Sequence, residues 1–138
     1  MTTGVILDTG PLVALLDRDE RHHEWAKTQL DAIRPPIVTC EAVLTETCHL
    51  LRSHPVAVNH IARFLESGVL SVPFSIGADH ESVFALMKKY RDVPMSFADA
   101  CLVRMVETGM GRLVFTLDTD FQVYRQRRRR MIEVIAPF

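Results

Sequence analysis

Short apolar runs alternate along the chain with longer segments in which apolar residues recur at helical spacing. The apolar runs cover residues 5–7, 37–39, 69–72, 113–116 and 132–135. Short, mostly apolar runs are typical of strands buried on both faces, and such strands occur in parallel sheets. The pattern therefore predicts five strands in one parallel sheet.

The intervening segments predict helices over residues 11–16, 20–32, 41–52, 57–66, 77–90 and 96–107, with a short helix at 121–126. Pro11 suits a first helical turn, because the N–H that proline lacks has no partner there. Gly68 and Gly109 follow two of these helices and are expected to act as C-caps. One stripe of the helix 41–52 is expected to face the core: Val43, Leu44, Thr47, Leu50 and Leu51.

Strands that alternate with helices define an α/β fold, with a central parallel sheet between two layers of helices. No linker, repeat or low-complexity segment interrupts the 138 residues, so we expect a single domain over residues 1–138. The composition, 48% hydrophobic and 24% charged, is that of an ordinary globular protein. In open sheets of this kind, ligands bind outside the carboxyl ends of the strands. The residues that follow each strand are therefore the first candidates for chemistry.

Four acidic residues lie at or near this edge of the predicted sheet. Asp8 directly follows the first strand and Asp118 follows the fourth. Asp99 lies in the first turn of the helix that Ser96 begins, and Glu46 borders the apolar stripe of its own helix. Each residue alone also has a structural explanation. Asp8 and Asp118 can cap a helix or turn, Ser96 and Asp99 match a capping box, and Glu46 can simply be solvated.

The combination of the four acids is more informative than any one of them. Capping does not require acids to converge, yet this topology brings three of them to one edge and lets the fourth reach it. Carboxylates that converge repel one another, and a divalent cation relieves the repulsion. Mg²⁺ takes oxygen ligands and is commonly held by one or two carboxylates together with phosphate. The acids therefore favour a metal-dependent phosphoryl-transfer site.

Competing chemistries lack the residues that they need. The phosphate-binding loops GxxxxGK[ST] and GxGxxG are absent. A phosphatase of the haloacid-dehalogenase kind would carry a second acid two residues after Asp8, where this chain has Gly10. A phosphoacceptor signalling domain needs a lysine near the late strands, and residues 101–138 contain none.

The remaining composition favours a reduced compartment. The three cysteines, Cys40, Cys48 and Cys101, form no CxxC pair, so neither a zinc site nor a disulfide framework is expected. No apolar run approaches the roughly 20 residues of a membrane span, and the first residues do not resemble a signal peptide. We therefore expect a cytoplasmic protein without a membrane partner.

Four segments carry a resemblance to a known family, and they follow the family's order: LDTGPLVALLDRDERHH, TCEAVLTETCHLL, MSFADACLVRM and LVFTLDTDFQVYR. They resemble the four acidic motifs of PIN-domain proteins, and most of all those of VapC-type ribonuclease toxins. The resemblance extends from Asp8 to the last strand. It implies a PIN-like three-layer α/β/α fold with a five-stranded parallel sheet, and endonucleolytic cleavage of RNA with one or two Mg²⁺ or Mn²⁺ ions.

The resemblance also assigns roles to residues of this chain. Asp8 and Asp99 would be the principal metal ligands, and Glu46 and Asp118 would complete the pocket through the metal or its waters. Two residues flank the fourth motif and would serve as auxiliary groups that position water or metal, namely Thr116 and Asp120.

The same resemblance implies partners. Members are usually homodimers, and as toxins they are blocked by a small antitoxin protein whose tail enters the groove. The alternative function is a non-catalytic PIN module that binds RNA or a protein partner. An intact acidic quartet argues against it, because a binding module does not need four charges that repel one another.

A run of arginines, RQRRRR at residues 125–130, makes the end of the chain basic. Residues 101–138 carry seven Lys/Arg against four Asp/Glu, although the whole chain has a formal net charge of -1. The run directly precedes the last strand, so in a parallel sheet it should lie on the far side from the acids. A solvated surface, an acidic protein partner and a distal RNA contact all remain open, and added salt would weaken an RNA contact steeply.

Overall fold

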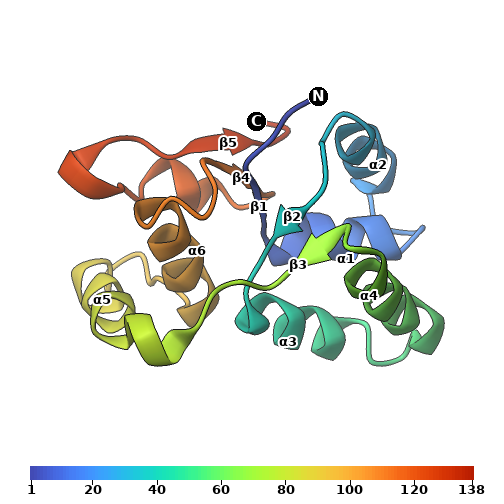
Figure 1. Ribbon diagram of the computed structural model, residues 1–138, viewed down its shortest axis with the longest axis horizontal. Helices are drawn as coiled ribbons and strands as arrows, with labels where there is room; N and C mark the ends of the chain where they lie inside the picture. Colours follow the sequence, from blue (N-terminus) through green and yellow to red (C-terminus); the bar gives the residue numbers. More distant parts are fainter.

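A computed structural model describes residues 1–138 and contains one five-stranded sheet (Figure 1). The strand order is β3-β2-β1-β4-β5, and every neighbouring pair is parallel. The strands are β1 (Val5–Leu7), β2 (Ile37–Val38), β3 (Leu70–Ser71), β4 (Leu113–Phe115) and β5 (Glu133–Ile135). The predicted fold class is therefore confirmed.

Six α-helices cover the sheet: α1 (Thr9–Leu16), α2 (His23–Asp31), α3 (Glu41–Leu50), α4 (Pro55–Ser67), α5 (Ile76–Lys89) and α6 (Phe97–Glu107). Figure 1 shows α5 and α6 on one side of the sheet and α1, α2 and α4 on the other. Helix α3 contacts both α1 and α6, so it bridges the two layers. None of the helices is long and apolar enough to span a membrane.

The central strands place the first two site residues side by side. Val5, Ile6 and Leu7 are all buried, as expected of a strand that is covered on both faces. Leu7 of β1 lies opposite Phe115 of β4. The next residue of each strand is polar, so Asp8 and Thr116 leave the sheet together at its carboxyl edge.

Three caps form where the sequence predicts them. Gly68, the C-cap of α4, has φ 81°, and Gly109 just beyond α6 has φ 77°, a backbone conformation that glycine adopts without a steric penalty. At the start of α6, Oγ of Ser96 accepts a hydrogen bond of 3.0 Å from the Asp99 N–H. This bond satisfies a backbone group that the helix itself cannot pair.

Two local predictions are wrong. The helix predicted at 121–126 is instead a single 3₁₀ turn at Thr119–Gln122, because the Asp118 side chain caps an earlier turn and the chain then directs Tyr124 into the core. Leu50, predicted to face the core, is 57% exposed. Helix α3 ends at Leu50, and Leu51, which was also predicted to face the core, turns inward just beyond the helix and is buried.

Candidate metal centre

The first carboxylate of the centre, Asp8, follows β1 and is held in place by the neighbouring strand β4. Its backbone N–H donates to the Phe115 carbonyl at 3.0 Å, which continues the pairing of β1 with β4. The buried Thr116 hydroxyl donates to Oδ2 of Asp8 at 2.7 Å and accepts from the Asp118 N–H at 2.9 Å. A single hydroxyl thus joins the ends of the two central strands to each other and to the loop that carries Asp118.

The second carboxylate, Asp99, lies in the first turn of α6 and is also buried. The Tyr124 hydroxyl donates to its Oδ2 at 2.8 Å. Tyr124 is completely buried, and its ring packs edge-on against Phe121 and Tyr90 with centroids 5.2 Å away in each case. A buried tyrosine needs a partner for its hydroxyl. Here the partner of the Tyr124 hydroxyl is Asp99, so the bond fixes the orientation of the Asp99 carboxylate.

The exposed side chain of Glu46 reaches the centre from α3. Its Oε2 accepts a hydrogen bond of 2.8 Å from the hydroxyl of Thr9, the residue that follows Asp8. The bond joins α3 to the first turn of α1. It holds the exposed glutamate beside the buried aspartate that leaves β1.

Asp118 and Asp120 form the fourth part of the centre, in the turn after β4. Oδ1 of Asp118 accepts from the Asp120 N–H at 2.9 Å. Asp99, Asp118 and Asp120 each offer an oxygen, and these three oxygens lie within 4.8 Å of one another. Acids from α6 and from the loop after β4 therefore meet at a spacing that one metal ion could bridge.

All of these acids line one open cavity of about 600 Å³ at the carboxyl edge of the sheet. Its wall contains Asp8, Thr9, Gly10, Glu46, Pro94, Ser96, Asp99, Leu117, Asp118, Thr119 and Asp120. Five of these residues are acidic and none is a lysine, arginine or histidine. The cavity therefore has strong negative charge that no side chain in its wall compensates.

This environment changes the ionisation of the buried acids. Burial is the largest cause that raises the pKa of Asp8, and the charges of Asp99 and Asp118 act in the same direction. Against the opposing hydrogen bonds from Thr116 and the Thr9 N–H, the net result is a pKa of about 7. Burial likewise raises the pKa of Asp99 to about 6, while the hydrogen bond from Tyr124 opposes the increase. The pKa of Asp120 is raised by burial and by Asp118. A bound cation would favour the charged form of each acid.

The donor set fits a hard divalent cation. Every donor atom in the cluster is a carboxylate oxygen, the ligand that Mg²⁺ and Mn²⁺ prefer over soft sulfur or imidazole groups. The openness of the cavity leaves room for the waters that Mg²⁺ retains. The residues present can therefore hold such an ion at the wall of the open cavity.

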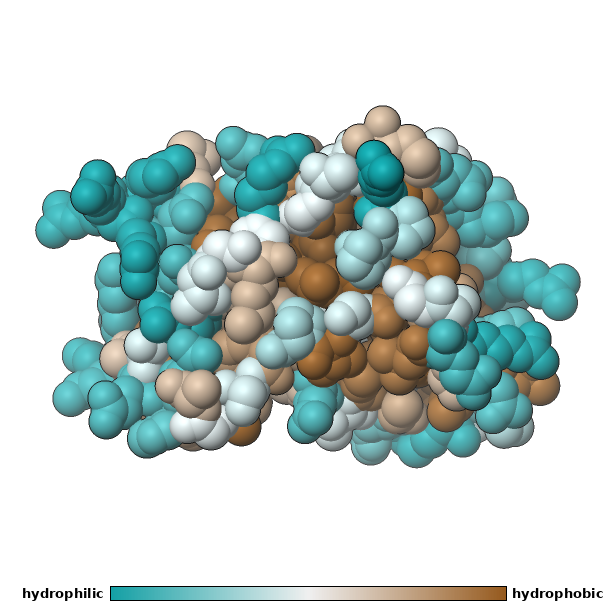
Figure 2. Space-filling view, in the orientation of Figure 1, coloured by the Kyte–Doolittle hydropathy of each residue, from teal (hydrophilic) through white to brown (hydrophobic).

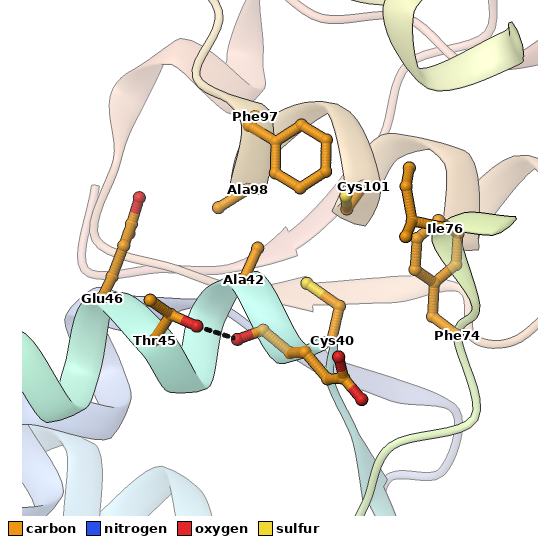
Figure 3. Close-up of a pocket in the computed structure, with 10 residues that line it drawn as sticks. Cys40, Ala42, Thr45, Glu46, Phe74, Ile76, Phe97, Ala98 and Cys101 are labelled. Carbon is orange, nitrogen blue, oxygen red and sulfur yellow. Dashed lines mark hydrogen bonds between the residues drawn. The ribbon is translucent and has the colours of Figure 1, made fainter. Parts of the chain in front are cut away.

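The cavity adjoins a second, apolar hollow of about 410 Å³ between α3 and α6 (Figure 3). Cys40 and Cys101 lie in its wall, together with Phe74 and Phe97. Glu46 lines both cavities, so it marks the boundary between the acidic and apolar surfaces. All three cysteines are free.

The structure brings every predicted site residue to this cavity or its immediate support. Asp8, Glu46, Asp99, Asp118 and Asp120 line it, and Thr116 lies beneath it. The capping roles are also real, since Asp8 caps α1 and Asp118 caps the 3₁₀ turn.

Two supporting residues, Thr9 and Tyr124, were not predicted from the sequence. Thr9 adjoins Asp8 in the first motif, and Tyr124 lies in the fourth. Those positions were the only signals that could have found them. Neither position reveals which carboxylate the side chain contacts.

Comparisons with known proteins agree with the arrangement of the chain. The family model of the PIN domain matches residues 5–126. The crystal structure of VapC20 from Mycobacterium tuberculosis, described as a sarcin–ricin-loop-cleaving toxin, superposes with a TM-score of 0.77 at 22% sequence identity. The match covers 86% of this chain and 93% of that one. No curated protein sequence matches the chain.

Proposed function

Since the chain belongs to the PIN domain family, we propose that it is a Mg²⁺- or Mn²⁺-dependent endoribonuclease and the toxin of a type II toxin–antitoxin pair. One observation carries the proposal: acids from β1, α3, α6 and the loop after β4 line a single open cavity. A protein with only a binding function gains nothing from burying Asp8 and Asp99 in mutual repulsion. Binding of one or two divalent ions would relieve the repulsion between these buried carboxylates.

We assign Asp8 and Asp99 as the principal metal ligands, with Glu46 and Asp118 completing the site. The bound ion would polarise a phosphodiester, activate a water molecule and stabilise the leaving oxygen. Thr116 and Asp120 act as auxiliary residues: Thr116 orients Asp8 through its hydroxyl, and Asp120 adds a further carboxylate at the cavity wall. These assignments follow the order of the family's motifs.

The supporting hydrogen bonds keep the two principal carboxylates in fixed orientations. The Tyr124 hydroxyl donates a hydrogen bond to one carboxylate oxygen of Asp99. Both oxygens of Asp8 accept one bond each, from the Thr9 N–H and from Thr116, and each retains a second lone pair. The carboxylates are thus oriented before a metal or substrate arrives, which reduces the entropy lost on binding.

The proposed partners follow from the same family. We propose RNA as the substrate class, a small antitoxin as the inhibitor, a homodimer as the working form and the cytoplasm as the location. The structural neighbour from Mycobacterium tuberculosis, described as a sarcin–ricin-loop-cleaving toxin, supports the RNA substrate, whereas the antitoxin, the homodimer and the location rest on the family alone.

The proposal is tested by incubating the purified protein with a mixed RNA pool in Mg²⁺, in Mn²⁺ and in EDTA, beside the Asp99→Asn variant. Cleavage that requires the metal and disappears in the variant would support the ribonuclease. No cleavage by folded protein free of antitoxin would favour the non-catalytic binding module. Cleavage by the variant as well would reject the site.

A further inference from the structure

An arginine cluster, Arg127–Arg130, projects from the loop between Tyr124 and β5. All four residues are exposed, and no acidic side chain lies within 4.0 Å of their guanidinium groups. The neighbouring Arg125 differs, because its guanidinium donates to the carbonyls of residues 122–124. The cluster therefore presents four consecutive cations to solvent without an internal partner.

The cluster lies at the opposite edge of the sheet from the acids, as the topology predicts. Arg130 lines a cavity of about 480 Å³ with Gly4 and Arg112, which precede β1 and β4, and with Glu133, which begins β5. Val106 near the end of α6 lines this cavity too. Figure 2 shows hydrophilic side chains gathered at the end of the molecule that this loop occupies in Figure 1.

Helix α6 spans the distance between the two edges. Asp99 and Val106 lie seven residues apart on α6, which corresponds to about 10 Å along the helix axis. A stacked nucleic acid strand advances about 3.4 Å per nucleotide, so about three nucleotides cover that length. The separation of the two edges along α6 is therefore on the scale of a short oligonucleotide.

The backbone of the cluster holds an unusual conformation. Arg128 and Arg129 have φ values of 59° and 58°, a region that non-glycine residues rarely adopt. The loop is closed by hydrogen bonds from the Gln126 N–H to the Arg130 carbonyl and from the Gln126 side chain to the Met131 carbonyl. Strained backbone of this kind is concentrated at functional sites.

The acidic cavity supplies no cationic side chain for binding RNA. Its wall carries five carboxylates and no basic side chain, so the charge of even two divalent ions would not exceed theirs. Phosphate contacts supply most of the sequence-independent affinity for nucleic acids. The guanidinium group pairs with phosphate in a bidentate geometry, which suits arginine better than lysine to this role.

We infer that Arg127–Arg130 bind the phosphate backbone of RNA at a second site, on the edge of the sheet opposite the acidic cavity. Arg112 lies in the wall of the neighbouring cavity, but its guanidinium already pairs with Glu133 at 3.6 Å, so the site consists of the four unpaired arginines. The inference rests on the proposed function, because a polyanionic substrate is what makes a remote cationic site necessary. RNA is favoured over an acidic protein for the same reason.

The experiment measures binding without cleavage. A labelled pool of single-stranded RNA is titrated in EDTA with the Asp99→Asn protein, and binding is followed by fluorescence anisotropy. The test variant also carries Arg127→Gln, Arg128→Gln, Arg129→Gln and Arg130→Gln. The matched control removes the same charge from four exposed arginines elsewhere: Arg18→Gln, Arg21→Gln, Arg34→Gln and Arg63→Gln.

The test variant should bind RNA at least about tenfold more weakly than the control. Its dependence of log K on log salt should flatten by about 0.7 for each phosphate that the protein no longer neutralises. Equal RNA affinities for the two variants, with equal melting temperatures, would overturn the inference. The inference would also fail if the arginine substitutions weakened binding to an acidic polypeptide but left RNA binding unchanged. If the wild-type protein cleaves no RNA but the arginine substitutions still weaken RNA binding, the result would support the site and reject only the nuclease.

Discussion

The hydroxyl of Tyr124 donates a 2.8 Å hydrogen bond to Oδ2 of Asp99, so the chain after β4 fixes a carboxylate on α6. This bond favours the charged form of Asp99 and opposes the effect of burial on its pKa. Tyr124 thereby acts on the metal centre without lining the cavity.

The Tyr124→Phe substitution should raise the pKa of Asp99 above its present value of about 6. The acid limb of the pH–activity profile should shift to higher pH, and the protein should lose about 1–3 kcal/mol of stability. Cleavage rates from pH 5 to 9 and urea unfolding measure these effects. Tyr90→Phe is the control, because the Tyr90 hydroxyl contacts the Arg125 N–H and no carboxylate. The same pH shift in both variants would contradict the role given to Tyr124.

The Thr116→Val substitution keeps the shape of the buried side chain but removes its hydroxyl. Asp8 loses a donor and the Asp118 N–H loses an acceptor, so the pKa of Asp8 should rise above about 7. We expect a loss of about 1–3 kcal/mol in stability and weaker metal binding at neutral pH. Thr116→Ser, which retains the hydroxyl, should restore most of the metal affinity. If serine and valine behave alike in a Mn²⁺ titration, the hydroxyl has no role in orienting Asp8.

The Asp99→Asn substitution should lower metal-dependent cleavage by roughly a hundredfold or more, a larger effect than loss of a residue that only supports a ligand. Removing the charge of Asp99 should also lower the pKa of Asp8, because the two carboxylates repel each other. The metal-free variant should therefore be at least as stable as the parent at pH 7.5. Asp92→Asn changes an exposed acid outside the cavity and should leave cleavage unchanged. Retained cleavage by Asp99→Asn would reject this residue as a ligand.

Stability without metal should fall as the pH rises from about 4 to about 7. Asp8 and Asp99 have raised pKa values in the folded protein, so over this range the folded state binds more protons than the unfolded state. The slope of unfolding free energy against pH is then negative, and each unit of pKa difference corresponds to roughly 1.4 kcal/mol. Melting temperatures in EDTA at closely spaced pH values measure the effect. The prediction would be contradicted if the melting temperature of the parent protein rose with pH over this interval while that of Asp8→Asn fell.

Metal should reverse this trend at neutral pH. A ligand at a hundred times its Kd stabilises the folded state by about 2.7 kcal/mol. Mn²⁺ should therefore raise the melting temperature of the parent at pH 7.5, and much less that of Asp8→Asn or Asp99→Asn. An equal increase in all three proteins would place the ion elsewhere.

The sequence was enough to predict those acids of the metal centre that lie at the ends of strands or at the start of a helix. Asp8 and Asp118 follow apolar runs, and Asp99 follows a capping serine, so local patterns were enough to bring three acids to one edge. Parallel topology then determined that the edge was shared. These features depend on short segments and on one rule of connectivity.

The contacts that orient the acids could not be predicted in this way. The bond between Tyr124 and Asp99 joins residues 25 positions apart, and the bond between Thr9 and Glu46 spans 37. Both depend on how elements pack, as does the exposure of Leu50 at the end of α3. Periodicity places a residue on a face of its helix, but the point at which the helix ends decides what that face meets.

The carboxylates at one edge of the sheet and the arginines at the other contribute a dipole moment directed along the strands. With a net charge of only -1, the protein experiences little overall attraction or repulsion in the field of a polyanion. The field instead exerts a torque, which turns the arginine end forward and the carboxylates away. Encounters would then begin at the amino edge of the sheet, and the orientation of the molecule would be selected before its surface is touched.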